Sequence, residues 1–278
     1  MLALDKSTGL PLAMREDFSL EFGSGLSPVD PVAVDFSKLR VYLRNQSVSA
    51  ARRELYWTYR AVVLEADREK MGQAGLRYDL LVMPPGKLGE EFVKTKGYYN
   101  SLKAGTDVSY PQLLEISHGE AFLILQRPSA DPARLLELYL FSVGRGDKVI
   151  VPPGFGAVVV NPGKEVLVCS FWQAAANEES AEAYEILGGA GYYVAESQRL
   201  SREGDTKNDF EFVPNLNYKL LPKLQEAGVR ELPQFDLLSA LPMYFTGMRD
   251  PRSLDFLINP ENHRDDLKPE KLFVLPVV

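Results

Sequence analysis

Short apolar segments separated by Gly or Pro recur along the chain from Leu55 to Trp172. They mix aromatic and β-branched residues and return at intervals of about ten residues, which is typical of antiparallel strands in a sandwich or barrel. Alternating strands and helices would give a different spacing. The predicted strands are Leu55–Leu64, Arg77–Met83, Phe92–Lys96, Gln112–Ile116, Ala121–Gln126, Leu135–Val143, Lys148–Val151, Ala157–Val160 and Val166–Trp172.

One of these segments is ambiguous. The leucines of Pro132–Tyr139 also fit the start of a helix. Gly144 and Gly146 end that pattern early, so we favour a strand.

The two ends of the chain follow other patterns. The first fifty residues are rich in Gly, Pro and Ser and predict an extended arm. Beyond Trp172 there is a polar turn region at Ser201–Asn208, and the apolar tail Leu272–Leu275 can add an edge strand. Short helical segments are predicted at Phe36–Asn45, Glu178–Leu187, Asn217–Ala227, Leu237–Met248 and Ser253–Leu257. We therefore divide the chain into an N-terminal arm (1–50), a barrel core (51–218) and a C-terminal extension (219–278).

Composition narrows the functional classes. The formal net charge is −7, which argues against a nucleic-acid partner because phosphate neutralisation needs a basic face. No apolar run approaches the ~18 residues of a membrane span. The first residues, Met1–Gly9, lack the apolar core of a signal peptide. The single cysteine, Cys169, lies in an apolar run and suits a buried position in a reducing compartment, so we expect a cytoplasmic protein.

Two spaced patterns in the middle of the chain resemble the paired motifs of cupins. The first consists of Gly97-Tyr98-Tyr99-Asn100 followed by Gln112 to Gly119, and the second of Gly146, Pro152, Gly154, Ala157 and Asn161. The longer segments Pro85–Asn100, Pro111–Glu115, Val151–Gly154 and Tyr184–Ile186 resemble the archaeal-type (cupin) glucose-6-phosphate isomerases. The resemblance covers roughly residues 55–220.

This resemblance implies an all-β cupin fold, a double-stranded β-helix or jelly-roll barrel, in a protein that forms homodimers. Members of the family interconvert glucose 6-phosphate and fructose 6-phosphate and hold a divalent metal with a His-x-His pair, a Glu and a later His. The corresponding positions of this chain are Tyr98, Asn100, Gln112 and Ala157. Neutral imidazoles and a carboxylate are what such a metal requires. We therefore predict a divergent member that has lost its metal site and has no cofactor.

The resemblance also proposes substrate-binding residues. Thr95 and Gly97 match the phosphate-binding positions of the family, and Lys96 beside them adds positive charge. The alternative is that Thr-Lys-Gly is only a turn with a solvated lysine. With Tyr98, Asn100 and Gln112 these residues form the predicted substrate site.

Three further observations concern catalysis and ligand contact. Glu91 matches a family glutamate and is the candidate catalytic base, unless it is a structural carboxylate paired with a lysine or arginine. His118 falls in a predicted hairpin turn and His263 in a polar stretch, so neither is expected to act. On a strand, Tyr56 and Thr58 share one face and Trp57 and Tyr59 share the other. One of the two pairs therefore faces the barrel interior, where it either packs in the core or stacks on a sugar.

Three functions remain open from the sequence. The first is a glucose-6-phosphate isomerase-like cupin with a lost metal site and, if active, aldose–ketose isomerase activity. The second is a non-catalytic cupin that binds a sugar phosphate or small anion. The third is a structural protein whose barrel serves dimerisation.

Overall fold

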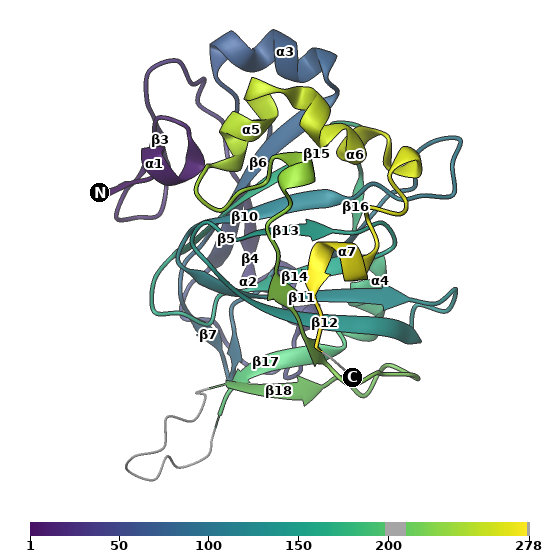
Figure 1. The fold of residues 1–278 in the computed structure, drawn as a ribbon. Helices are drawn as coiled ribbons and strands as arrows, with labels where there is room; N and C mark the ends of the chain where they lie inside the picture. Colours follow the sequence, from purple (N-terminus) through teal and green to yellow (C-terminus); the bar gives the residue numbers. More distant parts are fainter. Residues whose placement is uncertain (198–209, 277–278) are drawn as a thin grey trace.

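Two six-stranded sheets dominate the computed structural model, which describes residues 1–197 and 210–276 (Figure 1). The first sheet has the order β13-β10-β15-β6-β5-β4 and the second β16-β9-β14-β11-β12-β19. Between β10 and β15 the chain crosses repeatedly between the sheets: β10 lies in the first, β11 and β12 in the second, β13 in the first, β14 in the second and β15 in the first. This alternation with antiparallel pairing is that of a jelly-roll barrel, so the predicted all-β cupin fold is confirmed.

The strands of the two large sheets have the following bounds. The first sheet contains β4 (Val32–Asp35), β5 (Glu54–Tyr59), β6 (Leu76–Met83), β10 (Gln112–His118), β13 (Lys148–Val151) and β15 (Leu167–Ala174). The second contains β9 (Tyr98–Asn100), β11 (Glu120–Pro128), β12 (Leu135–Gly144), β14 (Gly156–Val160), β16 (Glu179–Ser180) and β19 (Gln225–Glu226).

Three smaller sheets complete the β-structure. They are formed by β1 (Leu2–Ala3), β2 (Leu12–Met14) and β3 (Leu20–Phe22); by β7 (Lys87–Leu88), β8 (Glu91–Phe92), β17 (Tyr192–Glu196) and β18 (Phe210–Pro214); and by β20 (Gly228–Val229) and β21 (Phe273–Val274).

The helices are short. The α-helices are α1 (Asp5–Thr8), α2 (Phe36–Leu39), α3 (Arg68–Gln73), α4 (Glu182–Leu187), α5 (Met243–Arg249), α6 (Asp255–Ile258) and α7 (Pro269–Leu272). The 3₁₀ helices are η1 (Arg40–Tyr42), η2 (Glu65–Asp67), η3 (Pro233–Phe235), η4 (Pro251–Leu254) and η5 (Pro260–Asn262). None of them, within the described residues, has the length and apolar character that crossing a membrane requires.

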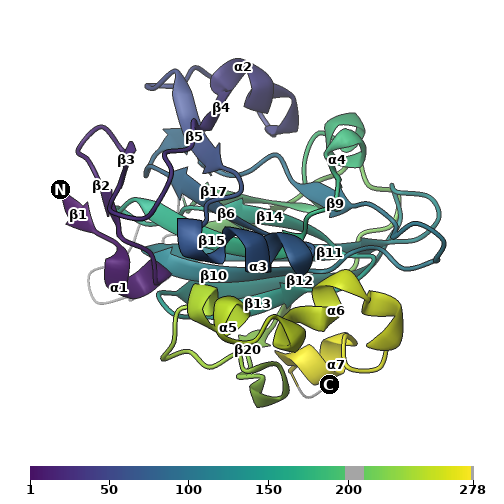
Figure 2. The ribbon, with the colours of Figure 1, turned by 90° about the horizontal axis from the view of Figure 1, so that it is seen from above.

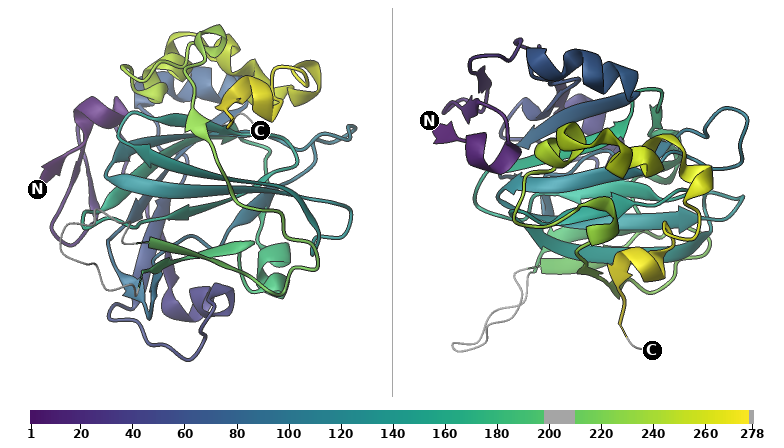
Figure 3. Two further views of the ribbon diagram at one scale, coloured as in Figure 1. Left: turned by 60° about the horizontal axis from the view of Figure 1, so that its bottom comes forward. Right: turned by 45° about the horizontal axis from the view of Figure 1, so that its top comes forward.

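Helix α3 and the helices α5 and α6 of the C-terminal extension cover the outer face of the first sheet. Figures 2 and 3 show α3, α5 and α6 over β15, β6 and β10. Trp172 on β15 faces these helices, and its indole N–H donates to the Met243 carbonyl (2.9 Å) while its ring stacks on Tyr244 (5.9 Å). The alternate residues Phe171 and Gln173 line the barrel interior. Because both faces of β15 are covered, all of its residues are buried.

A buried ion pair joins the extension to the barrel. Lys148 Nζ lies 2.8 Å from Glu115 Oε1, and both side chains are at most 5% exposed. The other carboxylate oxygen accepts the Met243 backbone N–H (2.8 Å), and Lys148 also donates to the Leu238 carbonyl (2.8 Å). Desolvation raises the pKa of Glu115, and Lys148 opposes that shift. The pair therefore anchors residues 238 to 243 against the first sheet.

Several element predictions need correction. The helix predicted at Asn217–Ala227 is wrong, because Leu220 bridges Arg134 and β19 pairs in parallel with β12. Pro222 also lacks the N–H that a helix interior needs. The strand predicted to run to Leu64 ends at Tyr59.

Other predictions hold in part or fully. The ambiguous segment is a strand, β12, and the apolar tail forms β21 against β20. The helix near Phe36–Asn45 consists of α2 and η1 and ends at Tyr42. The acidic helix starts at Glu182 and ends at Gly188 in the left-handed conformation, while Glu179–Ser180 forms β16. Ser201–Asn208 lies outside the described residues, and the division at residues 50 and 218 stays a prediction.

The buried ion pair gives a first prediction. Lys148→Met leaves the Glu115 carboxylate buried without its cation, so we expect the free energy of unfolding to fall by about 3–5 kcal/mol. Lys219→Met is the matched control, because Lys219 and Asp131 form an exposed pair at 3.0 Å. It should cost about 1 kcal/mol or less. Urea denaturation measures both, and equal losses would contradict the anchoring role.

Candidate functional site

A cavity of about 300 Å³ lies inside the barrel. Strands of the first sheet form one wall, and the segment 95–98 with β16 forms the other. Its polar lining residues are Tyr56, Thr58, Arg60, Asp79, Thr95, Lys96, Tyr98, Gln112, Gln173 and Glu179. Larger clefts of about 690 and 1050 Å³ have other linings, but we favour the interior cavity because polar side chains converge in it.

The Thr-Lys-Gly segment is both a tight turn and part of the cavity wall. The Thr95 backbone N–H donates to the Val159 carbonyl (2.8 Å), and the Thr95 hydroxyl accepts the Val159 N–H (3.0 Å). Gly97 has φ +88°, and a Cβ there would lie 2.7 Å from the Tyr184 ring. Lys96 is half-buried, with its Nζ 5.7 Å above the Tyr42 ring. The lysine is therefore not the fully solvated residue of a simple turn.

Two of the substituted metal positions are joined by a hydrogen bond. The Tyr98 hydroxyl donates to Gln112 Oε1, and Gln112 Nε2 donates to Glu179 Oε1 (3.1 Å). Desolvation, and then the nearby Glu179, raise the pKa of Tyr98 well above its ordinary value. Tyr98 is therefore a neutral donor, and both ends of the Gln112 amide are engaged.

The other two metal positions have different surroundings. Asn100 is not among the cavity-lining residues; its amide donates to the Tyr110 carbonyl (2.9 Å) and its oxygen accepts from Asn177 (2.9 Å). Ala157 is fully buried in β14, opposite Tyr98. Over residues 1–197 and 210–276, no three His, Cys, Asp or Glu side chains gather closely enough to hold a metal. A divalent transition metal does not fit this donor set.

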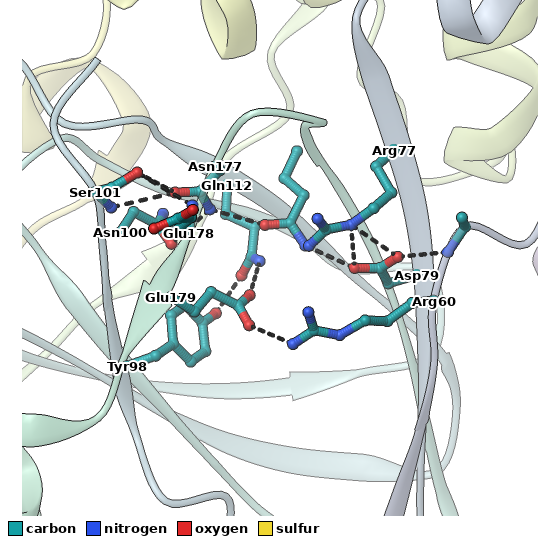
Figure 4. A network of polar contacts seen from close by, with 12 residues as sticks. Arg60, Arg77, Asp79, Tyr98, Asn100, Ser101, Gln112, Asn177, Glu178 and Glu179 are labelled. Carbon is teal, nitrogen blue, oxygen red and sulfur yellow. Dashed lines mark hydrogen bonds and ion pairs between the residues drawn. The ribbon is translucent and has the colours of Figure 1, made fainter. Parts of the chain in front are cut away.

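Glu179 is the cavity residue that the sequence did not reveal. It comes from β16, keeps 24% side-chain exposure, and lies 3.5 Å from Arg60 (Figure 4). Desolvation raises the pKa of Glu179; Arg60 opposes this shift and Asp79 adds to it. Glu179 lies in an acidic segment, which in a sequence is typical of a solvated surface. The pairing of β16 with β9 places it at the cavity. Arg60 did have a signal, because it continues the i, i+2 face of Tyr56 and Thr58.

A second chain of hydrogen bonds stiffens the cavity wall (Figure 4). Asp79 accepts from Arg77 Nε (2.9 Å), Gln173 Nε2 (2.7 Å) and the Ala61 N–H (2.8 Å). The Gln173 oxygen accepts from Asn177 (2.8 Å), which also binds Asn100. The network therefore runs from β6 through β15 to β9.

Glu91 lies apart from this cavity lining. Its carboxylate contacts Lys94 Nζ (2.6 Å) and accepts the Arg44 N–H (2.6 Å), with both charged side chains 5% exposed. This is the geometry of the structural ion pair that the sequence left as the alternative, and its catalytic role stays a prediction. His118 lies beside Glu165 (3.5 Å), and His263 beside Asp255 (2.9 Å), and neither is among the cavity-lining residues.

The barrel and its polar interior cavity define the protein as a cupin. A family model described as glucose-6-phosphate isomerase (GPI) matches residues 37–210. The chain therefore belongs to this family, the archaeal-type cupin glucose-6-phosphate isomerases, as the motifs predicted.

The similarity to solved structures is low. No curated protein matches the chain. Vicilin from Capsicum annuum is 12% identical over 48% of this chain, with a TM-score of 0.35, and oxalate decarboxylase from Bacillus subtilis is 17% identical over 45%, with a TM-score of 0.32. The chain spans 33% and 27% of those two chains, respectively. These scores are too low to carry an argument about function.

The tight turn at Gly97 can be tested. Gly97→Ala combines a left-handed backbone with a clash against Tyr184, so we expect a loss of about 2–5 kcal/mol in unfolding free energy. Gly105→Ala is the control, because Gly105 has φ +77° but nothing within 4 Å of the added Cβ. It should lose about 1–2 kcal/mol. Chemical denaturation compares them, and an equal loss would contradict close packing at the turn.

The raised pKa of Glu179 predicts a stabilising substitution. The folded protein binds the Glu179 proton more tightly than the unfolded chain, so the charged carboxylate opposes folding at pH 7. We expect Glu179→Gln to add about 1 kcal/mol of stability, or about 2–4 °C in melting temperature. The gain should shrink as the pH falls to the usual carboxyl range.

Glu178→Gln is the matched control for this stability measurement, because Glu178 is exposed and does not line the cavity. It should leave the melting temperature within about 1 °C at each pH, as surface substitutions usually do. A destabilised Glu179→Gln variant at pH 7 would contradict the assignment.

Proposed function

We propose that the barrel cavity binds a sugar phosphate without a transition metal. The observation that carries this proposal is the Tyr98–Gln112–Glu179 hydrogen-bond chain, which links two former metal positions inside a cavity bordered by Thr95, Lys96 and Gly97. This chain keeps the residues that match the family's phosphate-binding turn. The positions that match the family's metal ligands hold residues that do not suit a transition metal.

Charge supports the phosphate end of the ligand. Lys96 and Arg60 are the cations of the cavity lining, and the Thr95 hydroxyl already accepts from Val159, so it can donate its own proton inward. Hydrogen bonds between charged groups and phosphate oxygens are stronger than neutral ones. A phosphate dianion beside Lys96 therefore has suitable partners.

The remaining lining residues suit a sugar. Tyr98, Gln112 and Gln173 supply hydroxyl and amide groups, and Tyr56 supplies an aromatic face. The volume of about 300 Å³ lies at the lower end of ligand pockets and limits the ligand to about the size of a monosaccharide.

A second candidate function is aldose–ketose isomerisation without metal, and Glu179 is the observation that favours it. The reaction needs a base that removes a proton from one sugar carbon and returns it to the adjacent one. A partly desolvated carboxylate in the cavity can do this, and Arg60 beside it can stabilise the enediolate oxygen. In this candidate Glu179, and not Glu91, is the base.

We also propose a cytoplasmic homodimer. The family resemblance supports the homodimer, and the position of β4 at the end of the first sheet, where Val32 is 57% exposed, leaves a sheet edge open for pairing. The single cysteine, the buried Cys169, suits a reducing compartment. The third function, a purely structural barrel, does not explain why polar side chains converge in the cavity.

The binding proposal predicts a metal-independent thermal shift. In the presence of a chelator, glucose 6-phosphate at about 100 times its dissociation constant should add about 2.7 kcal/mol of stability. Lys96→Met should weaken binding by about tenfold or more because it removes a charge-assisted contact. Lys219→Met changes a lysine outside the cavity lining and should bind like the original protein.

Two outcomes would contradict the proposal. One is the absence of binding by glucose 6-phosphate or fructose 6-phosphate at millimolar concentration in calorimetry. The other is binding that appears only after a divalent metal is added. A coupled isomerase assay under the same conditions separates the first candidate from the second.

A further inference from the structure

The charges in the cavity are unequally balanced. Asp79 is 3% exposed and is held by Arg77, Gln173 and the Ala61 N–H, so its charge is fully compensated. The negative charge of Glu179 is less well compensated, because Arg60 lies 3.5 Å away and 54% of the Arg60 side chain is exposed. Gln112 adds one neutral hydrogen bond. Glu179 is therefore the carboxylate of the cavity that can take another cation.

A phosphate in the cavity makes this imbalance larger. Lys96 and Arg60 are the two cations that line it, so a bound phosphate dianion draws on the charge of Arg60. Among the described residues, Arg60 is the ion-pair partner of Glu179, so the carboxylate then faces the ligand with that partner shared. A partly buried carboxylate without compensation is costly, and a positively charged group on the ligand removes that cost.

The neighbours of Glu179 also suit an ammonium group. An ammonium carries three donors and needs acceptors around it. Glu179 offers two carboxylate oxygens, and Gln112 Oε1, which accepts from Tyr98, has a second lone pair. A sugar hydroxyl can use the same acceptors but brings no charge. The negative charge of Glu179, and not the hydrogen-bond geometry, therefore favours a charged amine over a hydroxyl.

We propose that the cavity selects a phosphorylated amino sugar, with the phosphate on Lys96 and Arg60 and the ammonium on Glu179. This inference rests on the proposed sugar-phosphate binding and names the substrate class of the same site. The anionic and cationic ends of such a ligand match the two kinds of charge that line the cavity. Its monosaccharide size matches the volume of about 300 Å³.

Calorimetry with three probes tests this selection at pH 7. The probes are glucosamine 6-phosphate, glucose 6-phosphate and N-acetylglucosamine 6-phosphate, in which the nitrogen is a neutral amide. We expect the first to bind at least about tenfold more tightly than the second, because each 1.4 kcal/mol changes affinity tenfold. The acetylated sugar should lose this advantage.

Two variants test whether Glu179 is the residue that gives the preference for the amine. Glu179→Gln keeps the shape and the hydrogen bond from Gln112 but removes the charge, so the ratio of the affinities for glucosamine 6-phosphate and glucose 6-phosphate should fall to about one. Glu178→Gln makes the same chemical change at the neighbouring exposed position and should retain the preference. Thermal melting of each variant confirms that it is folded.

The outcomes separate this inference from the proposal beneath it. Equal affinity for glucosamine 6-phosphate and glucose 6-phosphate overturns the amino-sugar selection and leaves sugar-phosphate binding intact. A preference that survives Glu179→Gln also overturns it, because another group then reads the amine. If none of the three probes binds, sugar-phosphate binding fails and the selection fails with it.

Discussion

The hydrogen bonds of Gln112 are the constraint on which the site depends. The Gln112 oxygen accepts from Tyr98 and its nitrogen donates to Glu179, so one amide ties together strands from both sheets. Only a group with a donor and an acceptor end can make both contacts. A glutamate at this position would place a second carboxylate against Glu179, and two like charges at that distance repel. The residues at 98, 112 and 179 are therefore coupled.

These contacts show how the polar side chains of the barrel interior satisfy one another. Tyr98 is held neutral by burial and by Glu179, and Asn100 is engaged by Tyr110 and Asn177. Three of the four positions that match the family's metal ligands, Tyr98, Asn100 and Gln112, thus take part in hydrogen-bond networks. Buried polar groups are tolerated when such networks satisfy them. Glu179 is the exception, since its environment raises its pKa and disfavours its charge, and a carboxylate with a shifted pKa in a cavity is a candidate functional group.

The sequence predicted the frame of the molecule better than the details of its cavity. The strands, the cupin fold and the proximity of Thr95, Lys96, Tyr98 and Gln112 could be predicted, because local patterns and family motifs specify them. Asn100 could not be placed, because its distant partner Asn177 draws it out of the cavity lining. Glu179 was missed for a similar reason, since its role depends on the pairing of β16 with β9. The helix prediction at Asn217–Ala227 was wrong because the local sequence pattern does not reveal that β19 pairs with the edge of β12.

We propose above all that the polar cavity of the barrel holds a phosphorylated sugar without a metal. A crystal structure of the protein soaked with a sugar phosphate, with anomalous data collected at transition-metal absorption edges, tests it most directly. We expect ligand density with the phosphate beside Lys96 and no anomalous peak near Gln112. A stoichiometric metal ion bound in the barrel by Glu179, Asp79 or other donors would contradict it.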